Sequence, residues 1–312
     1  MKDKNAKGGL SLARTLSRDF QQNKYKYLLI LPVLAYFIIF CYKPMYGLVI
    51  AFQDFRANLG ISRSQWVGFR NFRVFFNDPY FFRLFRNTLS ISLLSILFGF
   101  PAPIILAILL NEIKNVTFKR TVQTITYMPY FISMVVVAGL IKTYTTQGGI
   151  FSQIAIALGG TGKNFLMFPN YFYPIYVISD VWQHIGWNSI IYLAAITGIE
   201  QEQYEAAIID GAGRFRRIIS VTLPNLLPII MVLFILRMGG ILNVGFEKII
   251  LLYNPNIYSV ADVISSFVYR RGIMEAAYSY ATAVGLFNSV INIVFLVTAN
   301  YLSRKFTESS LF

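Results

Sequence analysis

The sequence predicts an all-α membrane protein with six transmembrane helices, and two observations carry this prediction. Of its 312 residues, 56% are hydrophobic and only 13% are charged, whereas a soluble domain is nearer half apolar and about a quarter charged. Six apolar stretches are also long enough for a helix of about 20 residues to cross a bilayer. They lie near residues 27–52, 88–110, 122–141, 171–199, 218–238 and 279–303.

Each of these spans is expected to be a helix, because a helix satisfies its own backbone hydrogen bonds in lipid. Charged residues within the spans are few: the first holds Lys43, the fourth Asp180, and the fifth Arg237 near its end. Prolines fall in several spans, and a membrane bundle tolerates the kinks that they cause. Because no linker or repeat divides the chain, residues 27–303 are predicted to form one domain between tails at 1–26 and 304–312.

The distribution of Lys and Arg predicts that both termini are cytoplasmic. The segments 1–26, 111–121, 200–217 and 304–312 would then face the cytoplasm, and they hold 15 Lys and Arg in 64 positions. The outer segments 53–87, 142–170 and 239–278 hold 11 in 104 positions. This is the asymmetry of the positive-inside rule. The loop 53–87 mixes aromatic residues with arginines, which fits either a short amphipathic helix at the interface or an irregular loop packed on the bundle.

Other function classes are poorly supported by the sequence. A net charge of +14 suggests nucleic acid in a soluble protein, but here the basic residues are spread over many short loops, as in proteins that face anionic lipid. A single cysteine, Cys41, and a single histidine, His184, argue against a disulfide or a metal centre. The segment "ALGGTGKN" at 157–164 lacks the first glycine and the final Ser/Thr of a phosphate-binding loop. We therefore expect no catalytic residues and no bound ATP.

The stretch "EAAIIDGAGRFRRIISVTLP" at 205–224 predicts a helix, a glycine turn and a second helix. Ala206 and Ala207 are strong helix formers, and Gly211 can adopt the positive φ that ends a helix and turns the chain. An ordinary amphipathic connector would explain "EAA" alone. The pattern is longer than this, however. After nine intervening residues, Gly211 is followed by Val221, one residue of any type, and then Leu223 and Pro224, and an ordinary connector does not explain this spacing.

This longer pattern resembles the signature cytoplasmic loop of membrane subunits of binding-protein-dependent ABC importers, with Val221 in place of the family's usual isoleucine. "DVWQHIGWNSIIYLAAITGIEQEQYEAAIIDGAG", "NTLSISLLSILFGFPAPIILAILLNE" and "YMPYFISMVVVAGL" resemble segments of carbohydrate-importing permeases. "YATAVGLFNSVINIVFLVTANYLSRK" resembles the last span of a subgroup associated with oligo- and polysaccharide uptake. The resemblance covers nearly the whole chain.

The resemblance implies the type I ABC importer permease fold, in the plasma membrane of a prokaryote. It implies that loop 200–220 is a coupling helix that docks on a separate cytoplasmic ATPase, which binds the ATP and Mg. The other implied partners are a second homologous permease, a second ATPase copy, an extracellular solute-binding protein and a carbohydrate, expected to be an oligosaccharide. The residues implied at the ATPase contact are Glu205, Ala206, Ala207, Asp210 and Gly211.

Polar residues within the spans are candidates for the substrate path, because such residues usually face a cavity or a partner. Carboxylate, imidazole and amide groups bind sugar hydroxyls, and an aromatic ring covers the apolar face of a sugar. The candidates are Asp180, His184, Trp187, Asn188, Asn243 and Asn288, and the first, second and fourth share one helix face. Two alternatives stay open: these groups tie helices together, or Asp180 and His184 relay protons in an ion-coupled carrier. A membrane-embedded enzyme is a third functional class, which the shortage of catalytic groups disfavours.

Overall fold

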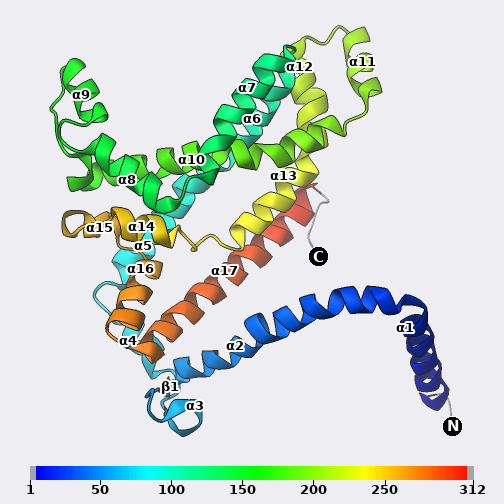
Figure 1. The fold of residues 1–312 in the computed structure, drawn as a ribbon, viewed down its shortest axis with the longest axis vertical. Helices are drawn as coiled ribbons and strands as arrows, with labels where there is room; N and C mark the ends of the chain where they lie inside the picture. The colour runs from blue at the N-terminus through cyan, green and yellow to red at the C-terminus, as the bar shows by residue number, and fades with distance from the viewer. Residues whose placement is uncertain (1–4, 308–312) are drawn as a thin grey trace.

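The computed structural model describes residues 5–307, and within this range the chain is built almost entirely of helices (Figure 1). Four helical stretches are long and apolar enough to cross a membrane: Gln22–Phe52, Phe81–Glu112, Arg214–Met238 and Tyr278–Lys305. They overlap the first, second, fifth and sixth predicted spans. The length and apolar character predicted for these four spans are therefore confirmed.

Three of these stretches are interrupted by a wide π-helical turn, and each turn ends two residues before a proline. Because proline has no backbone N–H and its ring crowds the preceding turn, the helix widens ahead of it. The turns lie over Phe37–Tyr42, Ser95–Gly99 and Ile218–Thr222, before Pro44, Pro101 and Pro224. The helices are α1 (Asn5–Tyr36), α2 (Lys43–Met45), α5 (Phe81–Leu94), α6 (Pro101–Glu112), α12 (Arg214–Arg217), α13 (Leu223–Met238) and the uninterrupted α17 (Tyr278–Thr307).

The third predicted span, 122–141, is not one straight helix, and this part of the prediction is wrong. The helix α7 (Val116–Tyr127) passes into a 3₁₀ turn (Met128–Phe131), and α8 (Met134–Thr145) then leaves at a bend of 101°. Pro129 lies in the turn, and the Ser133 hydroxyl caps α8 by accepting a hydrogen bond from the Val136 N–H at 3.4 Å. A proline followed by a helix cap ends one helix and begins another, although the hydropathy is continuous.

The fourth predicted span, 171–199, is a single helix, α10 (Pro169–Thr197). Polar residues interrupt its apolar sequence, and α10 is not among the helices long and apolar enough to cross a membrane. Among residues 5–307 the number of such helices is four, or five if the bent pair formed by α7 and α8 counts as one span. A total of six spans therefore stays a prediction.

The predicted outer loop 53–87 is folded rather than irregular. Strands β1 (Gln53–Asp54) and β2 (Gln65–Trp66) pair antiparallel around α3 (Gly60–Arg63), and α4 (Arg70–Phe76) follows. Phe75 of α4 is 1% exposed and lies against Phe287 of α17, with 5.5 Å between ring centroids. The loop thus contains a short helix, as one of the two alternatives expected, and this helix packs on the bundle.

Short helices complete the side of the molecule on which this loop lies. Of the segment 157–164, for which a loop is predicted, Ala157 is the last residue of a helix and residues 158–164 contain no helix or strand. The helices are α9 (Ile150–Ala157), α14 (Phe246–Leu252), α15 (Tyr258–Ala261) and α16 (Ile264–Tyr269), with 3₁₀ turns at Tyr46–Phe52, Phe165–Met167 and Pro255–Ile257 and a π turn at Arg270–Met274.

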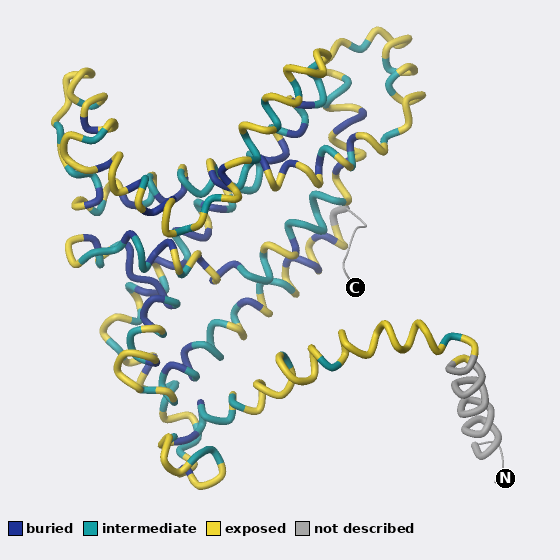
Figure 2. The backbone as a smooth tube through the Cα atoms, viewed as in Figure 1, coloured by how far each residue is buried: buried dark blue, intermediate teal, exposed yellow. Residues whose placement is uncertain are grey.

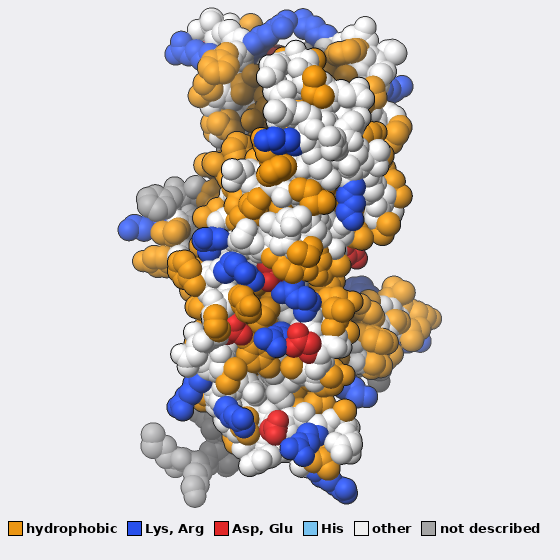
Figure 3. Space-filling model, turned by 90° about the vertical axis from the view of Figure 1, so that its left-hand side faces the viewer, with side chains coloured by type: hydrophobic (Ala, Val, Ile, Leu, Met, Phe, Trp, Pro, Cys, Tyr) orange, Lys and Arg blue, Asp and Glu red, His pale blue; other side chains and the backbone are white. Residues whose placement is uncertain are grey.

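The predicted division of the loops between the two sides of the membrane is consistent with the arrangement of the helices. In Figure 1 the connection between α6 and α7, helix α12 and the C-terminal end of α17 lie toward one side, whereas α3, α4, α9 and α15 lie toward the other. Figure 3 faces this second side and shows Lys and Arg in several separate places, some beside acidic side chains. Which of the two sides faces the cytoplasm stays a prediction, and residues 1–4 and 308–312 of the two predicted tails lie outside the described range.

Three buried clusters hold the bundle together, and α10 contributes to two of them. Phe172, Tyr176 and Val177 belong to a cluster shared with α5, α8, α14 and α15. Tyr192 and Ile196, further along α10, belong to a cluster shared with α6 and α13. A third cluster joins α4, α5, α16 and α17. Figure 2 shows the buried residues along these central helices, whereas the most apolar part of Gln22–Phe52 has no buried residue.

Candidate functional site

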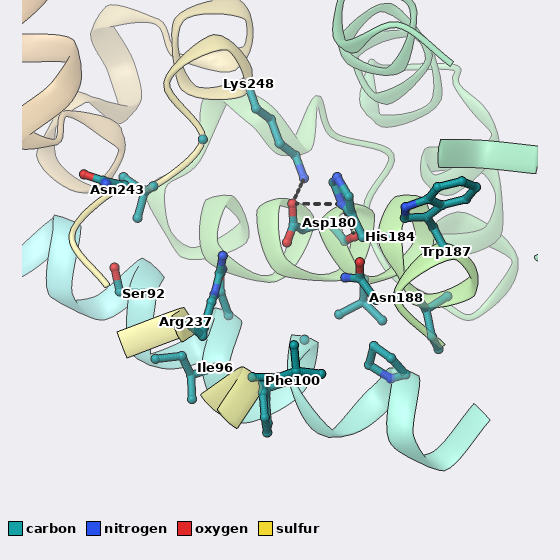
Figure 4. Close-up of a pocket in the computed structure, with 18 of the residues that line it drawn as sticks. Ser92, Ile96, Phe100, Asp180, His184, Trp187, Asn188, Arg237, Asn243 and Lys248 are labelled. Carbon is teal, nitrogen blue, oxygen red and sulfur yellow. Dashed lines mark hydrogen bonds and ion pairs between the residues drawn. The ribbon is translucent and has the colours of Figure 1, made fainter. Parts of the chain in front are cut away.

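A cavity of about 690 Å³ lies between α5, α6, α10, α13 and α14 (Figure 4). It opens along the middle of α10, between the two buried clusters to which the ends of that helix belong. Its volume falls within the range of about 300–1,000 Å³ that is typical of small-molecule sites. Five of the predicted substrate-path residues line it: Asp180, His184, Trp187, Asn188 and Asn243.

Asp180 is held on the cavity wall by two basic side chains. Its Oδ1 lies 3.6 Å from the Lys248 Nζ and 3.5 Å from the His184 Nδ1. The His184 Nδ1 also donates a hydrogen bond to the backbone carbonyl oxygen of Asp180 at 2.9 Å, so this nitrogen carries the proton. Asp180 and His184 thus lie on one face of α10, as their spacing predicted, and Lys248, which the sequence reasoning missed, joins them.

Lys248 is almost completely buried, with 1% of its side chain exposed. Its Nζ donates a hydrogen bond to the carbonyl oxygen of Tyr176 at 2.9 Å and lies 4.5 Å from the centroid of the Tyr176 ring. These contacts join α14 to α10, so Lys248 and Asp180 form one polar link between the two helices. The sequence signal was a lysine beside the apolar run "IILL", but nothing in the sequence placed it beside Asp180.

Arg237 is a second cationic group that the sequence analysis located but gave no role. It lies in the last turn of α13, where a cation is favoured by the helix dipole. Figure 4 shows its side chain pointing into the cavity. Among residues 5–307 no carboxylate lies within ion-pair distance of the guanidinium.

The Trp187 ring packs against other aromatic rings, so only part of its surface is open to the cavity. Its ring stacks on Tyr130 with centroids 4.6 Å apart and planes 5° apart, and Phe131 meets it edge-on at 5.4 Å. Both partners come from the turn that follows α7. Because Tyr130 covers one face of the indole ring, only the opposite face and the edges remain for a bound molecule. The side chain is still 40% exposed and lines the cavity.

The asparagines divide between the cavity and the helix contacts. The Asn243 Oδ1 accepts hydrogen bonds from the Asn288 Nδ2 at 3.1 Å and from the Asn292 Nδ2 at 3.3 Å. Asn288 does not line the cavity on α10; it lines a second cavity of about 520 Å³ between α16 and α17. These hydrogen bonds join the segment after α13 to α17, as the alternative role of tying elements together requires, and Asn243 lines the cavity on α10 as well.

The loop 200–220 has the predicted helix, glycine turn and helix. Helix α11 (Gln201–Ile209) is capped by Asp210 and followed by Gly211, whose φ is +76°. The Gly211 N–H donates to the Ile208 carbonyl and the Ala212 N–H donates to the Ala207 carbonyl, both at 2.9 Å. This pair of bonds is a Schellman motif, and it explains why a glycine is needed at this position. The chain then enters α12 and the wide turn that leads into α13.

Two side-chain hydrogen bonds join α11 to the start of α13 and its preceding turn. The Tyr204 and Thr222 hydroxyls lie 3.0 Å apart, and the Asn225 Nδ2 donates to the Gln203 Oε1 at 2.8 Å. The tip of the loop is apolar and open, because Ile209 is 86% exposed. The predicted contact residues lie on this projecting unit: Glu205, Ala206, Ala207, Asp210 and Gly211.

Helices of membrane-spanning length and an internal cavity lined by both polar and apolar side chains are features that a membrane permease requires. Residues 80–308 match the family described as the binding-protein-dependent transport system inner membrane component, and the chain belongs to this family. It is therefore a transport component and not an enzyme, as the sequence predicted, and an independent ion-coupled carrier is not favoured. Within the described part of the chain, no group of three or more His, Cys, Asp or Glu residues is arranged to hold a metal ion.

Similar proteins extend over nearly the full chain. Protein LplB of Bacillus subtilis (strain 168) is 47% identical over 305 residues, which cover 97% of this chain and 95% of that protein. The polygalacturonan/rhamnogalacturonan transport system permease protein YteP of the same organism is 43% identical over 292 residues, covering 93% and 91%. In the crystal structure of a bacterial ABC transporter involved in the import of the acidic polysaccharide alginate, one chain matches with a TM-score of 0.87 and 44% identity, covering 94% of this chain and 99% of that one.

Proposed function

We propose that this chain forms half of the path along which an ATP-driven importer moves an oligosaccharide into a prokaryotic cell. The observation that carries the proposal is the cavity of about 690 Å³, which brings a carboxylate, an imidazole, amides and an aromatic edge together within the bundle. These are the groups that hydrogen-bond sugar hydroxyls and cover the apolar face of a sugar ring. The polysaccharide substrates in the names of YteP and of the alginate importer support the same substrate class.

A single bundle of this kind leaves the path open on one side, so a second homologous permease completes it. Two copies of a separate ATPase supply the energy and bind the ATP and Mg. A matching solved structure is of the alginate transporter in complex with an alginate pentasaccharide-bound periplasmic protein, which supports an extracellular solute-binding protein as the further partner. In this proposal both termini and loop 200–220 face the cytoplasm.

Loop 200–220 is the proposed contact with the ATPase. Its exposed apolar tip, with Ile209 86% exposed, has the character of a surface that a partner cleft covers. Small residues such as Ala206 let a helix sit deep in such a cleft. The hydrogen bonds of Tyr204 with Thr222 and of Gln203 with Asn225 join α11 to the turn before α13 and to α13 itself. Helix α13 lines the cavity through Leu233 and Arg237. Movement of α11 would therefore be transmitted to the cavity wall, which is how a two-state element links two distant sites.

The experiment that tests this role compares Gly211→Pro and Glu205→Lys with Gly213→Ala in the assembled transporter. Proline cannot adopt the φ of +76° at position 211, whereas Gly213 has a negative φ and open space where an alanine Cβ would lie. The first two variants are expected to reach the membrane but to lose ATP-dependent import, and the third to keep it. Normal import by both Gly211→Pro and Glu205→Lys would contradict the coupling role.

A further inference from the structure

The N-terminal part of α1 is a separate helix from the first spanning stretch. The backbone of Asn23 departs from helical geometry, with φ of −116° and ψ of 22°, so residues 5–22 precede a bend and the rest of α1 follows it. Figure 1 shows the first part of α1 at a steep angle to the stretch that leads to α2. At a rise of 1.5 Å per residue, residues 5–22 form a helix about 27 Å long with its own direction.

Side-chain hydrogen bonds hold the bend at Asn23. The Asn23 Nδ2 donates to the Asp19 Oδ1 at 2.7 Å, and the Tyr27 hydroxyl donates to the Asp19 Oδ2 at 2.5 Å. Asp19 precedes the bend and Tyr27 follows it, so its carboxylate joins the two helices. The direction in which the first helix leaves the span is therefore set by contacts within the chain.

The bend lies where the spanning stretch enters the headgroup region of the bilayer. Lys24, Tyr25, Lys26 and Tyr27 follow it, all of them exposed, and the apolar run begins at Leu28. Lys and Tyr are typical of this region, because the stem or ring lies in apolar surroundings while the polar tip reaches water. A helix that leaves the span at this level and at a steep angle lies close to lipid headgroups along its length.

Residues 5–22 have an apolar and a basic side when their sequence is wound into a helix. At about 100° per residue, the apolar residues fall within an arc of about 160° and the basic residues within a separate arc of about 40°. The apolar residues are Ala6, Leu10, Leu12, Ala13, Leu16 and Phe20, and the basic residues are Lys7, Arg14 and Arg18. An apolar arc beside a basic one is the pattern of a helix that lies in the plane of the membrane interface.

We propose that residues 5–22 lie flat on the cytoplasmic face of the bilayer and bind anionic phospholipid headgroups through Lys7, Arg14 and Arg18. The inference rests on the cytoplasmic N-terminus of the proposed function and adds a lipid site to it. The apolar arc faces the acyl chains, and the basic arc faces the headgroups. The cytoplasmic leaflet carries anionic lipid, and each Lys or Arg near its surface strengthens binding about fivefold.

Two observations favour a lipid surface over a protein partner. The helix is continuous with Gln22–Phe52, whose most apolar part has no buried residue and so presents to its surroundings the apolar surface that lipid requires. The charge is also complementary, because residues 5–26 hold five Lys and Arg residues and a single acidic residue, Asp19. Both oxygens of that carboxylate accept hydrogen bonds at the bend.

The test places a fluorescent label on either side of the helix, in the complete transporter in lipid nanodiscs. Cys41→Ser removes the one native cysteine, and Leu16→Cys or Ser11→Cys then carries nitrobenzoxadiazole. These two positions lie about 140° apart, the first within the apolar arc and the second outside it. Nitroxide on the lipid acyl chains quenches a label in the bilayer, and acrylamide quenches a label in water. The bilayers contain phosphatidylcholine alone or mixed with an equal part of phosphatidylglycerol.

With phosphatidylglycerol present, nitroxide is expected to quench mainly the label at position 16 and acrylamide mainly the label at position 11. In phosphatidylcholine alone, this difference should be much smaller. The variant Lys7→Gln/Arg14→Gln/Arg18→Gln should weaken binding to the anionic surface by roughly 100-fold, the product of three basic contacts. The difference between the two positions should then be lost in the mixed bilayer as well.

The control variant Arg56→Gln/Arg63→Gln/Arg70→Gln removes the same charge from exposed positions of the outer loop and should leave the quenching pattern unchanged. Equal quenching at positions 11 and 16 overturns the inference. Shielding of position 16 from acrylamide without quenching by nitroxide means that protein covers it, and this also overturns the inference. An identical pattern in both lipid mixtures overturns the assignment to anionic headgroups.

ATP-dependent oligosaccharide import by the same preparations separates this inference from the function on which it rests. Normal import with equal quenching at the two positions contradicts the lipid site alone. Absent import with the expected quenching pattern supports the lipid site and contradicts the import function. In proteoliposomes, the membrane-impermeant reductant dithionite should bleach the label at position 11 from the side on which the ATPase is bound, and bleaching only from the opposite side contradicts the orientation that both proposals require.

Discussion

Replacing Asp180 by asparagine is expected to destabilise the protein more than replacing Lys248 by methionine. The Lys248 Nζ and the Asp180 Oδ1 lie 3.6 Å apart, which corresponds to an attraction of about 4–5 kcal/mol at an effective dielectric constant of about 20. The two side chains differ in exposure: 27% for Asp180 and 1% for Lys248. Asp180→Asn leaves a buried ammonium without its counterion, whereas Lys248→Met leaves a carboxylate that cavity water can reach.

The expected cost of Asp180→Asn is about 3–5 kcal/mol, the range measured when one member of a buried ion pair is removed. Lys248→Met loses the hydrogen bond to the Tyr176 carbonyl, for about 1–3 kcal/mol. The double variant should be close to Lys248→Met alone, because the asparagine is harmless once the buried cation is gone. The coupling free energy between the two positions should therefore equal the cost of Asp180→Asn in magnitude, about 3–5 kcal/mol.

The assay is the free energy of unfolding of the purified protein in lipid nanodiscs, measured by denaturant titration for the two single variants and the double variant. Lys142→Met, which removes an exposed lysine from α8, serves as the control and should change the free energy by less than about 0.5 kcal/mol. If the two single costs are equal and add in the double variant, the pair makes no energetic contribution and the reasoning is refuted.

Three other predictions follow from single contacts. Gly186→Ala places a Cβ 2.0 Å from a backbone carbonyl oxygen of α7, so it should lower the free energy of unfolding by about 3 kcal/mol or more and reduce the yield of folded protein. The control Gly285→Ala meets nothing within 4 Å and should leave the stability unchanged. Equal melting temperatures of the two variants would contradict this. The Asp262 carboxylate, 1% exposed, pairs with Arg83 and Arg270, so Asp262→Asn should lower the free energy of unfolding by about 3–5 kcal/mol. The control Asp54→Asn, at an exposed ion pair, should cost less than about 0.5 kcal/mol. Thermal unfolding compares the two variants, and similar shifts in melting temperature would show that the buried ion pairs contribute little. Trp187→Ala should reduce sugar uptake roughly two- to tenfold through loss of an aromatic contact, and unchanged uptake would remove this ring from the path.

The sequence predicted correctly those features that depend on interactions between residues close together in the chain. The Gly211 turn was predictable because a single residue type adopts positive φ at low cost, and the observed φ of +76° agrees. The pairing of Asp180 with His184 was predictable because residues four apart share a helix face. The break within 122–141 was missed although Pro129 and Ser133 were visible, since continuous hydropathy was given more weight than the turn chemistry.

Other features of the site depend on contacts between distant segments. Lys248 lies in a different helix from Asp180, and no sequence pattern indicates that α14 packs against the middle of α10. One face of the Trp187 ring is occupied by Tyr130 and not free for a sugar, because α7 bends at the turn that contains this tyrosine. Asn288 carries the amide expected of a sugar-binding residue, yet the packing of α17 directs it to Asn243.

Composition, hydropathy and the pattern around Gly211 determined that this is a helical membrane protein with a projecting helix–turn–helix loop, because backbone hydrogen bonding in lipid and the conformational freedom of glycine act within a few residues. The tertiary structure decided which charges meet. It paired Asp180 with Lys248 and left Arg237 facing the cavity without a carboxylate partner among the described residues, because ion pairing depends on distances between side chains that only the packing of α10, α13 and α14 sets.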